Sequence, residues 1–285
     1  MHRTELTMKH LFFLLASPLA LTSLTYGAGY LENFNGLNNN ADLAGQGGWI
    51  ISGNASNATS DVSYVETSFL AGQTYAGYLG YQDLASGEGS VYLSHSYSDS
   101  LVGNTAQYTE FLASIAIFDS SFVSGSPTVA NRDSFGITFR NGASNLLTIK
   151  ITPDSQAFNP DSSIRVDNLT WSGFGSSGSA IPFATMTEGG AGNPANLRIL
   201  FTPSGVSDVL FTLSSGGVPI TSGVLPGAAG ENLTNFGFTM NTFSGTSDVG
   251  SNRFGFDNLS VVPEPSAALL GLLGASFAMG RRRRA

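Results

Sequence analysis

The central part of this sequence is built from short runs in which apolar and polar residues alternate strictly. Clear examples are residues 90–97, 110–117, 146–152 and 208–213. Because successive side chains of a strand point to opposite faces, such alternation predicts strands with one face on a core and one toward water. The residues expected to face the core are Val91, Leu93, His95, Tyr97, Phe111, Ala113, Ile115, Ile117, Leu147, Ile149, Ile151, Val209, Phe211 and Leu213.

The segments between these runs are rich in Gly, Asn, Ser, Asp and Pro, which are the residue types that form turns. The pair Asn141-Gly142 separates the run ending at Arg140 from the next one and predicts a tight hairpin. No stretch of the central part has a clear helical period. About a dozen strands at this spacing favour an all-β fold, either a two-sheet β-sandwich or a jelly roll.

Composition limits what this central body, residues 29–262, can bind. It contains six Lys and Arg against 18 Asp and Glu, a net charge of −12. Such a charge repels nucleic acid and anionic lipid, and it is compatible with neutral glycans, divalent cations and solubility outside the cell. The chain has no cysteine and must be stabilised by its core alone, which a body of this length can supply. We therefore expect one β-sandwich domain over residues 29–262.

The N-terminus has the features of a secretory signal peptide. A basic start at Met8-Lys9-His10 precedes the apolar run Leu11–Ala16, and small residues gather at Gly27-Ala28-Gly29. A positive region, an apolar region and small residues at the exit, in this order, direct a chain into export through the Sec translocon. The sequence thus predicts that residues 1–28 are removed on export.

The C-terminus, residues 263–285, contains three elements in order. The prolines of Pro263-Glu264-Pro265 hold this tripeptide extended, and the apolar segment Ala267–Gly280 carries no charge. That segment has 14 residues, fewer than the ~17–25 of a stable membrane-spanning helix. Four arginines follow it, so we expect a temporary membrane segment whose basic end stays in the cytoplasm. The alternatives are a retained single-pass anchor and a tail packed on its own domain.

These three elements closely resemble the PEP-CTERM sorting signal of Gram-negative bacteria. The resemblance covers Pro263 to Arg284 and implies that the protein is exported and then processed at its tail by an exosortase, a membrane-embedded enzyme. It also implies association with exopolysaccharide and biofilm matrix, and therefore a place at the cell surface or in the extracellular matrix. The short hydrophobic helix would enter the membrane transiently. The residues assigned to sorting are the recognition element Pro263, Glu264 and Pro265 and the cytoplasmic charge cluster Arg281, Arg282, Arg283 and Arg284.

The two ends of the body resemble a concanavalin A-like (laminin G-like) jelly roll. The segments Tyr30–Gly36 and Gly45–Trp49 resemble its opening, and Arg253–Val261 resembles its closing strand. In that fold the closing strand returns beside the first, so the resemblance implies that these segments pair. A generic β-sandwich is the alternative.

Residues suited to catalysis are scarce in the body. His95 is its only histidine, and the absence of cysteine excludes a thiol nucleophile and a thiolate metal site. The nucleophile-elbow pattern Gly-x-Ser-x-Gly does not occur. Glycoside hydrolysis needs two carboxylates at a suitable separation, but Glu110 and Asp119 have no acidic partner at strand spacing. We therefore expect a non-catalytic protein, with a glycoside hydrolase of concanavalin A-like fold as the less favoured alternative.

Aromatic residues suggest glycan binding as a hypothesis for the body. Five of the nine tyrosines fall within residues 75–97, and both tryptophans lie in the body. Exposed aromatic faces stack on sugar rings. The candidate glycan-binding residues are Trp49, Trp171, Tyr78 and Tyr81. The alternative is that these rings fill the core and cover the sheet edges.

A structural calcium ion is a second binding hypothesis, because Asp and Asn side chains are plentiful and calcium prefers oxygen ligands. No Asp-x-Asp-x-Asp-Gly loop occurs, and Asp167-Asn168 and Asp257-Asn258 each lie inside an expected strand. The sequence therefore predicts no cofactor and leaves two functions open. One is a glycan-binding module of the extracellular matrix, and the other is a structural surface protein without a small ligand.

Overall fold

The computed structural model describes most of the body, in segments. These are residues 29–38, 41–53, 63–67, 75–80, 89–101, 108–118, 134–158, 163–180, 183–187, 194–242 and 253–263. The predicted signal peptide and the predicted tail beyond Pro263 lie outside them. All elements assigned within the described segments are strands, and no helix there is long and apolar enough to cross a membrane.

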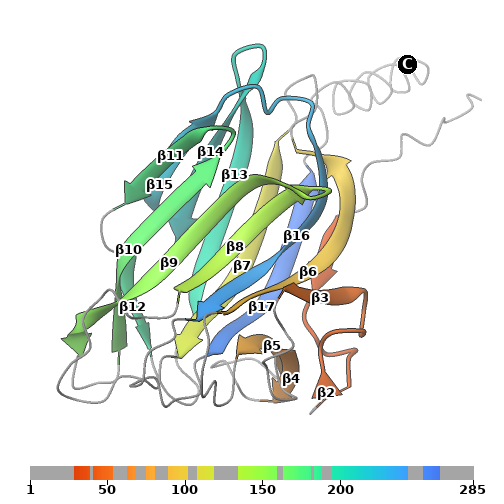
Figure 1. The fold of residues 1–285 in the computed structure, drawn as a ribbon, viewed down its shortest axis with the longest axis vertical. Coiled ribbons are helices and arrows are strands. Elements are labelled where there is room, and N and C mark those ends of the chain that lie inside the picture. Colours follow the sequence, from red (N-terminus) through yellow and green to blue (C-terminus); the bar gives the residue numbers. More distant parts are fainter. Residues whose placement is uncertain are drawn as a thin grey trace, which may run out of the picture.

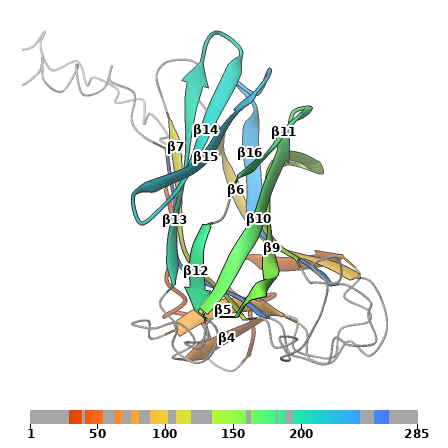
Figure 2. The same cartoon turned by 90° about the vertical axis from the view of Figure 1, so that its left-hand side faces the viewer.

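The strands form two antiparallel sheets that face each other (Figures 1 and 2). Sheet A contains β1 (Tyr30–Glu32), β2 (Ala41–Asp42), β4 (Ser63–Thr67), β5 (Tyr75–Gly80), β7 (Thr109–Phe118), β13 (Ala195–Ser204), β14 (Asp208–Ser215), β15 (Val218–Leu225) and β17 (Arg253–Pro263). Sheet B contains β3 (Trp49–Gly53), β6 (Gly89–Ser100), β8 (Ser134–Asn141), β9 (Ser144–Phe158), β10 (Ser163–Gly173), β11 (Ser176–Ala180), β12 (Phe183–Thr187) and β16 (Asn232–Thr242).

The predicted two-sheet β-sandwich is confirmed, and the chain crosses repeatedly between its layers. Sheet A has the strand order β15-β14-β13-β7-β17-β5-β4-β2, with β1 paired to β17, and sheet B has the order β11-β10-β9-β8-β16-β6-β3, with β12 paired to β10. Strands β5 to β8 alternate between the sheets, as do β15 to β17. The closing strand lies beside the opening one as expected, because Tyr30 of β1 pairs with Val261 of β17.

The core lies between the two sheets and is rich in phenylalanine. The alternating runs point inward as predicted, since every residue expected to face the core is buried except His95, which is half-buried. Rings from opposite sheets meet there: Phe238 of β16 stacks on Phe256 of β17, with centroids 3.9 Å apart and planes at 11°. Phe111 of β7 meets Phe139 of β8 edge to face at 5.1 Å. The core contacts therefore join the sheets along their central strands.

The predicted hairpin at Asn141-Gly142 is confirmed as the connection between β8 and β9. Asn141 pairs with Ser144, and Gly142 has a φ of +57°. A two-residue turn of this kind needs positive φ, which glycine adopts without steric cost. The hairpin fixes the register of β8 against β9 and thus decides which of their side chains face outward.

Candidate functional site

The face of sheet B that points away from the core, here called the outer face of sheet B, carries mainly hydroxyl and amide side chains. Because Leu169, Ile149 and Ile137 point inward and are buried, their strand neighbours point outward. The pairing register aligns the outward residues in rows across the strands. One row is Ser179, Thr170, Lys150, Gly136, Thr239, Tyr92 and Ser52, and the next is Ser177, Ser172, Thr148, Thr138, Gly237, Ser94 and Ile50.

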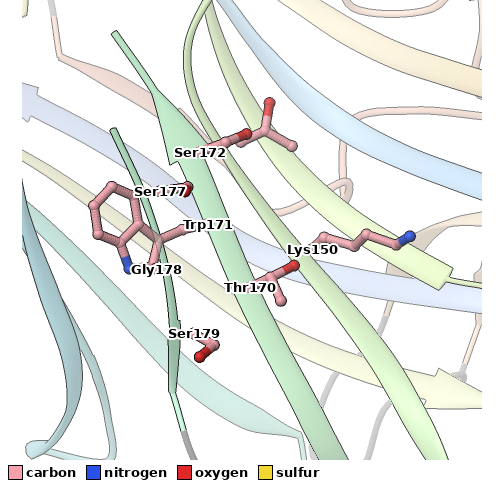
Figure 3. A pocket seen from close by; sticks show the side chains of 8 residues that line it. Lys150, Thr170, Trp171, Ser172, Ser177, Gly178 and Ser179 are labelled. Atoms are coloured by element: carbon pink, nitrogen blue, oxygen red, sulfur yellow. The ribbon is translucent and has the colours of Figure 1, made fainter. Parts of the chain in front are cut away.

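A hollow of about 520 Å³ lies over the β9–β10–β11 end of this face (Figure 3). It is lined by Thr148, Lys150, Thr170, Trp171, Ser172, Ser177, Gly178 and Ser179. Lys150 is exposed, and its side chain extends away from the indole of Trp171 (Figure 3). Small-molecule sites in proteins typically occupy ~300–1,000 Å³, so a sugar ring fits this volume. The hydroxyl groups around it can each donate and accept hydrogen bonds.

Trp171 forms the inner side of the hollow rather than an exposed platform. Its indole meets Phe211 of the opposite sheet at 4.8 Å, with the planes at 76°. Two glycines make room for it: a Cβ on Gly178 would lie 2.5 Å from Nε1, and one on Gly223 would lie 2.3 Å from Cζ2. Glycine is therefore needed at both positions for the indole to wedge between the edges of the two sheets.

A second polar cluster lies next to the hollow on β6, β8 and β16. The guanidinium carbon of Arg140 stands 3.7 Å from the centroid of the Tyr92 ring, and its Nε donates to Asn145 Oδ1 at 2.8 Å. The Tyr92 hydroxyl donates to Asn235 Oδ1 at 2.9 Å. Gly237 gives the ring room to lie against the sheet, since a Cβ there would come within 2.9 Å of it. The cluster therefore holds a cation in a fixed place on the face.

Thr138 connects the hollow to the cluster of Arg140, Tyr92 and Asn235. Its Oγ1 donates to Oγ1 of Thr148, a residue of the hollow, at 3.4 Å. Its carbonyl oxygen lies 3.5 Å from the Tyr92 hydroxyl. Burial raises the pKa of Tyr92, and the nearby Arg140 charge opposes this shift. The phenol therefore stays neutral and remains a hydrogen-bond donor at physiological pH.

His95, the only histidine of the body, contacts a backbone carbonyl oxygen with each of its two ring nitrogens. Nδ1 lies 2.7 Å from the carbonyl oxygen of Ser96, and Nε2 lies 2.8 Å from that of Gly47. Because a carbonyl oxygen only accepts, a neutral imidazole satisfies one of these contacts and an imidazolium satisfies both. The ring also packs against Tyr30 at 4.3 Å and Trp49 at 5.4 Å. These contacts give His95 a structural role between β3 and β6.

Three buried polar groups, one each on β1, β3 and β17, lack a well-aligned hydrogen-bond partner among the described residues. They are the Tyr30 hydroxyl, the Trp49 indole nitrogen and Asp257 Oδ1. Asp257 is 1% exposed. Burial raises its pKa from 3.8 to about 6, the backbone N–H of Asn258 lowers it, and the charge of Glu32 raises it again. Burial and the same Glu32 charge also raise the pKa of Tyr30.

The raised pKa of Asp257 predicts that stability falls as the pH rises from about 4 to about 6. The unfolded chain releases this proton at lower pH than the folded protein, so the folded state loses up to about 3 kcal/mol across that window and no more above it. Asp257→Asn should remove the decrease in stability that this carboxyl causes and should raise the melting temperature at about pH 7.

Asp208 provides the matched control for the Asp257 measurement. The backbone N–H of Gly227 and the hydroxyl of Ser207 lower the pKa of this exposed carboxylate. Asp208→Asn should therefore leave the decrease in stability between about pH 4 and 6 unchanged. Melting temperatures of both variants and the parent protein across this range decide the question. An unchanged pH profile for Asp257→Asn would show that this carboxyl does not cause the decrease.

The structure favours the packing alternative for three of the four candidate glycan-binding residues. Trp49 is 1% exposed and lies in the core, and Trp171 is buried as described above. Tyr78 is 5% exposed, on the side of β5 opposite the core residue Leu79. Tyr81 lies outside the described residues. Of the sorting residues, the structure describes only Pro263, the last residue of β17.

Sequence reasoning missed the polar residues that the sheet brings together. Arg140, Tyr92 and Asn235 come from three different runs, and none has a distinctive neighbour in the sequence. A usable signal was present, because the alternation that marks inward residues also marks the outward ones. Those outward positions include Ser94, Thr148 and Lys150, but the sequence does not show which runs share a sheet.

Within the described segments, no group of three or more His, Asp and Glu side chains stands close enough to hold a metal ion. Asp257-Asn258 lies in β17, where the register shifts and Asn258 adopts a φ of +50°. This bulge gives Asn258 a local conformational role: its Nδ2 donates to Ser114 Oγ at 3.5 Å. Asp167-Asn168 lies in β10, beside register shifts against β9.

The protein is an antiparallel β-sandwich, and the comparisons with known proteins concern its fold alone. No family model and no curated protein matches the sequence. Among solved structures, a mutant of alginate lyase Aly36B in complex with alginate trisaccharide is 11% identical with a TM-score of 0.49, covering 83% of this chain and 98% of its own. The lectin UEA-II complexed with galactose is 10% identical with a TM-score of 0.40, covering 85% and 100%. The CBM2 module of the evolved Dit of Lactobacillus casei BL23 phage J-1 is 14% identical with a TM-score of 0.40, covering 81% and 93%.

Proposed function

We propose that this protein is an exported, non-catalytic glycan-binding β-sandwich, and that the outer face of sheet B is its binding surface. The observation that carries the proposal is the hollow of about 520 Å³ lined by five hydroxyl side chains and one amine. Sugars present many hydroxyl groups, and a ring of side-chain hydroxyls can act as donor or acceptor to each of them. The hollow is on a sheet, and its side chains are held by strand pairing.

This rigidity favours binding because little order has to be created when a ligand arrives. Thr170 and Ser172 of β10 are paired on one side with β9 and on the other with β11. The side chains of the hollow therefore stand at fixed spacing before any sugar binds. Strands position a site more precisely than loops do.

The non-catalytic part of the proposal is supported by His95. A general base needs a free ring nitrogen within reach of its substrate. Both ring nitrogens of His95 face backbone carbonyl oxygens, at 2.7 and 2.8 Å. Using this histidine as a base would break a contact that joins β6 to the turn before β3.

The binding surface is tested by filling the hollow with a large side chain. Ser172 is exposed and lines the hollow, whereas Ser222 is exposed on β15 of the other sheet. Ser172→Trp should weaken binding at least about tenfold, and Ser222→Trp, the matched control, should leave it unchanged. Binding is measured by affinity electrophoresis in gels that contain neutral or acidic polysaccharides.

Two results would contradict this function. If the parent protein migrates identically with and without every polysaccharide, it is a structural surface protein without a glycan ligand. If Ser172→Trp binds as well as the parent protein does, the surface lies elsewhere. Melting temperatures of both variants show whether each is folded.

The export part of the proposal is supported by the two ends of the sequence. A signal peptide over residues 1–28 delivers the chain to the Sec translocon, and the tail of residues 263–285 holds it in the inner membrane until an exosortase-type enzyme cuts it. The released domain then resides at the cell surface or in the extracellular matrix, with exopolysaccharide as its partner. The net charge of −12 on the body opposes association with nucleic acid.

A further inference from the structure

We infer that the outer face of sheet B selects glycans that carry carboxylates, with Arg140 as the group that binds one carboxylate directly. This inference rests on the proposed function and names the class of sugar that the face accepts. It depends on how Arg140 is held, on where Lys150 lies, and on the groups between them.

Arg140 is fixed in place while its outer nitrogens remain available. The Tyr92 ring lies beneath the guanidinium at 3.7 Å, and Asn145 Oδ1 accepts from Nε at 2.8 Å. Tyr92 is itself held by its hydrogen bond to Asn235. Neither Nη nitrogen has a protein acceptor among the described residues. Two parallel N–H groups, held in a plane, match the two oxygens of a carboxylate.

Arg198 shows the contrasting arrangement on the other sheet. Its Nε forms an ion pair with Glu110, and the two residues lie on the neighbouring strands β13 and β7. That guanidinium is already neutralised by a carboxylate of the protein. Arg140 is instead packed against an aromatic ring and an amide, which leaves its charge for a ligand.

Lys150 supplies a second positive charge on the same face. It is exposed, lines the hollow, and has no ion pair with a carboxylate among the described residues. Lys150 pairs with Gly136, which is four residues before Arg140 on β8. At ~3.3 Å per residue and ~4.8 Å between strands, the two backbones are about 14 Å apart. One monosaccharide does not span this distance, so the face fits an oligosaccharide.

The side chains between the two cations are hydroxyl groups. In the row between Lys150 and Arg140, the half-buried Thr148 presents its hydroxyl on the face, and Thr138, which is 1% exposed, holds Thr148 through a hydrogen bond of 3.4 Å. Among the described outward side chains of sheet B there is no Asp or Glu. A hydroxyl group between two cations complements a chain of sugars that bears hydroxyls and carboxylates in repeat. On a body with a net charge of −12, these two cations, which form no ion pair with a described carboxylate, make this part of the surface locally positive.

The test compares one polysaccharide with and without its charges. Affinity electrophoresis of the full chain is run in gels containing polygalacturonate, its fully methyl-esterified form, or dextran sulfate. The backbone of the first two is the same, so a difference between them reports the carboxylates. We expect at least about tenfold tighter binding to polygalacturonate than to the ester, and weaker binding to dextran sulfate than to polygalacturonate.

The variants identify the residue responsible. Arg140→Gln and Arg140→Lys should both lose about tenfold or more in affinity for polygalacturonate, because lysine keeps the charge but loses the planar pair of donors. Lys150→Gln, at an exposed position, should lose several-fold in affinity for polygalacturonate. Arg198→Gln, the control for total charge, should bind as the parent protein does. Thermal unfolding confirms that each variant is folded.

The outcomes separate this inference from the function on which it rests. Equal binding to polygalacturonate and its ester, or undiminished binding by Arg140→Gln, overturns the carboxylate selectivity. If binding to the ester is still abolished by Ser172→Trp, glycan binding at this face stands. Preferential binding to dextran sulfate overturns the assignment of carboxylate as the recognised anion. Failure to bind any polysaccharide overturns both.

Discussion

Replacing Phe256 with alanine is expected to lower the free energy of unfolding by about 3–5 kcal/mol. Phe256 is fully buried on β17, and its ring meets rings from both sheets. It stacks on Phe238 at 3.9 Å and packs against Phe34 at 5.7 Å and Trp49 at 5.8 Å. Alanine would leave a cavity at the point where the two layers join, and rigid strands on both sides cannot collapse to fill it.

Urea unfolding followed by tryptophan fluorescence measures this loss, because Trp49 reports on the same cluster. Val206→Ala is the control: Val206 is fully exposed in the turn between β13 and β14, and its replacement should change the free energy of unfolding by less than about 0.5 kcal/mol. A loss below about 1 kcal/mol for Phe256→Ala would show that the contacts between rings contribute little to holding the sheets together.

Replacing Arg281, Arg282, Arg283 and Arg284 with alanine is expected to abolish normal processing of the tail. The apolar segment before them has 14 residues and is too short to be a stable anchor by itself. In the proposed sorting mechanism the basic cluster keeps the end of the tail in the cytoplasm, because moving four charges through the membrane is costly. Without the cluster we expect the tail to slip through the membrane, so that the proposed processing enzyme would no longer meet Pro263-Glu264-Pro265 in position.

The measurement is the mass of the protein recovered from its host, together with its C-terminal peptide. The parent protein should end near Pro263 to Pro265. A variant with four lysines in place of the arginines is the matched control and should be processed normally, since it retains the charge. Normal processing of the alanine variant would refute this mechanism. An intact arginine end on the parent protein would identify the tail as a retained anchor.

The strands of this fold could be predicted from the sequence because one rule governs them. Alternation assigns each residue a face, and residues as far apart as Val91 and Leu213 took the predicted side of the core. The turn residues Asn141-Gly142 likewise predicted the β8–β9 hairpin, in which Gly142 has the positive φ. The pairing of β1 with β17 followed from a resemblance at the two ends of the body and not from any local signal.

The candidate site could not be predicted in the same way because it depends on which strands become neighbours. Tyr92 and Asn235 are hydrogen-bonded although 143 residues separate them, and only the pairing of β6 with β16 brings them together. The tryptophans drew attention as sugar-stacking residues, but their large apolar area favours burial. Trp171 sits at an inward position next to Leu169 in the alternation, so its burial follows from the same rule.

The central place of β17 sets the order in which this protein can be made. Residues 253–263 pair with β1, β5 and β7, and they bring Phe254 and Phe256 into the core. Until this strand is synthesised, sheet A has a gap in its middle and the Phe238 ring lacks its contact with Phe256. The earlier strands cannot complete sheet A before this strand arrives, so folding is completed by the last strand of the body.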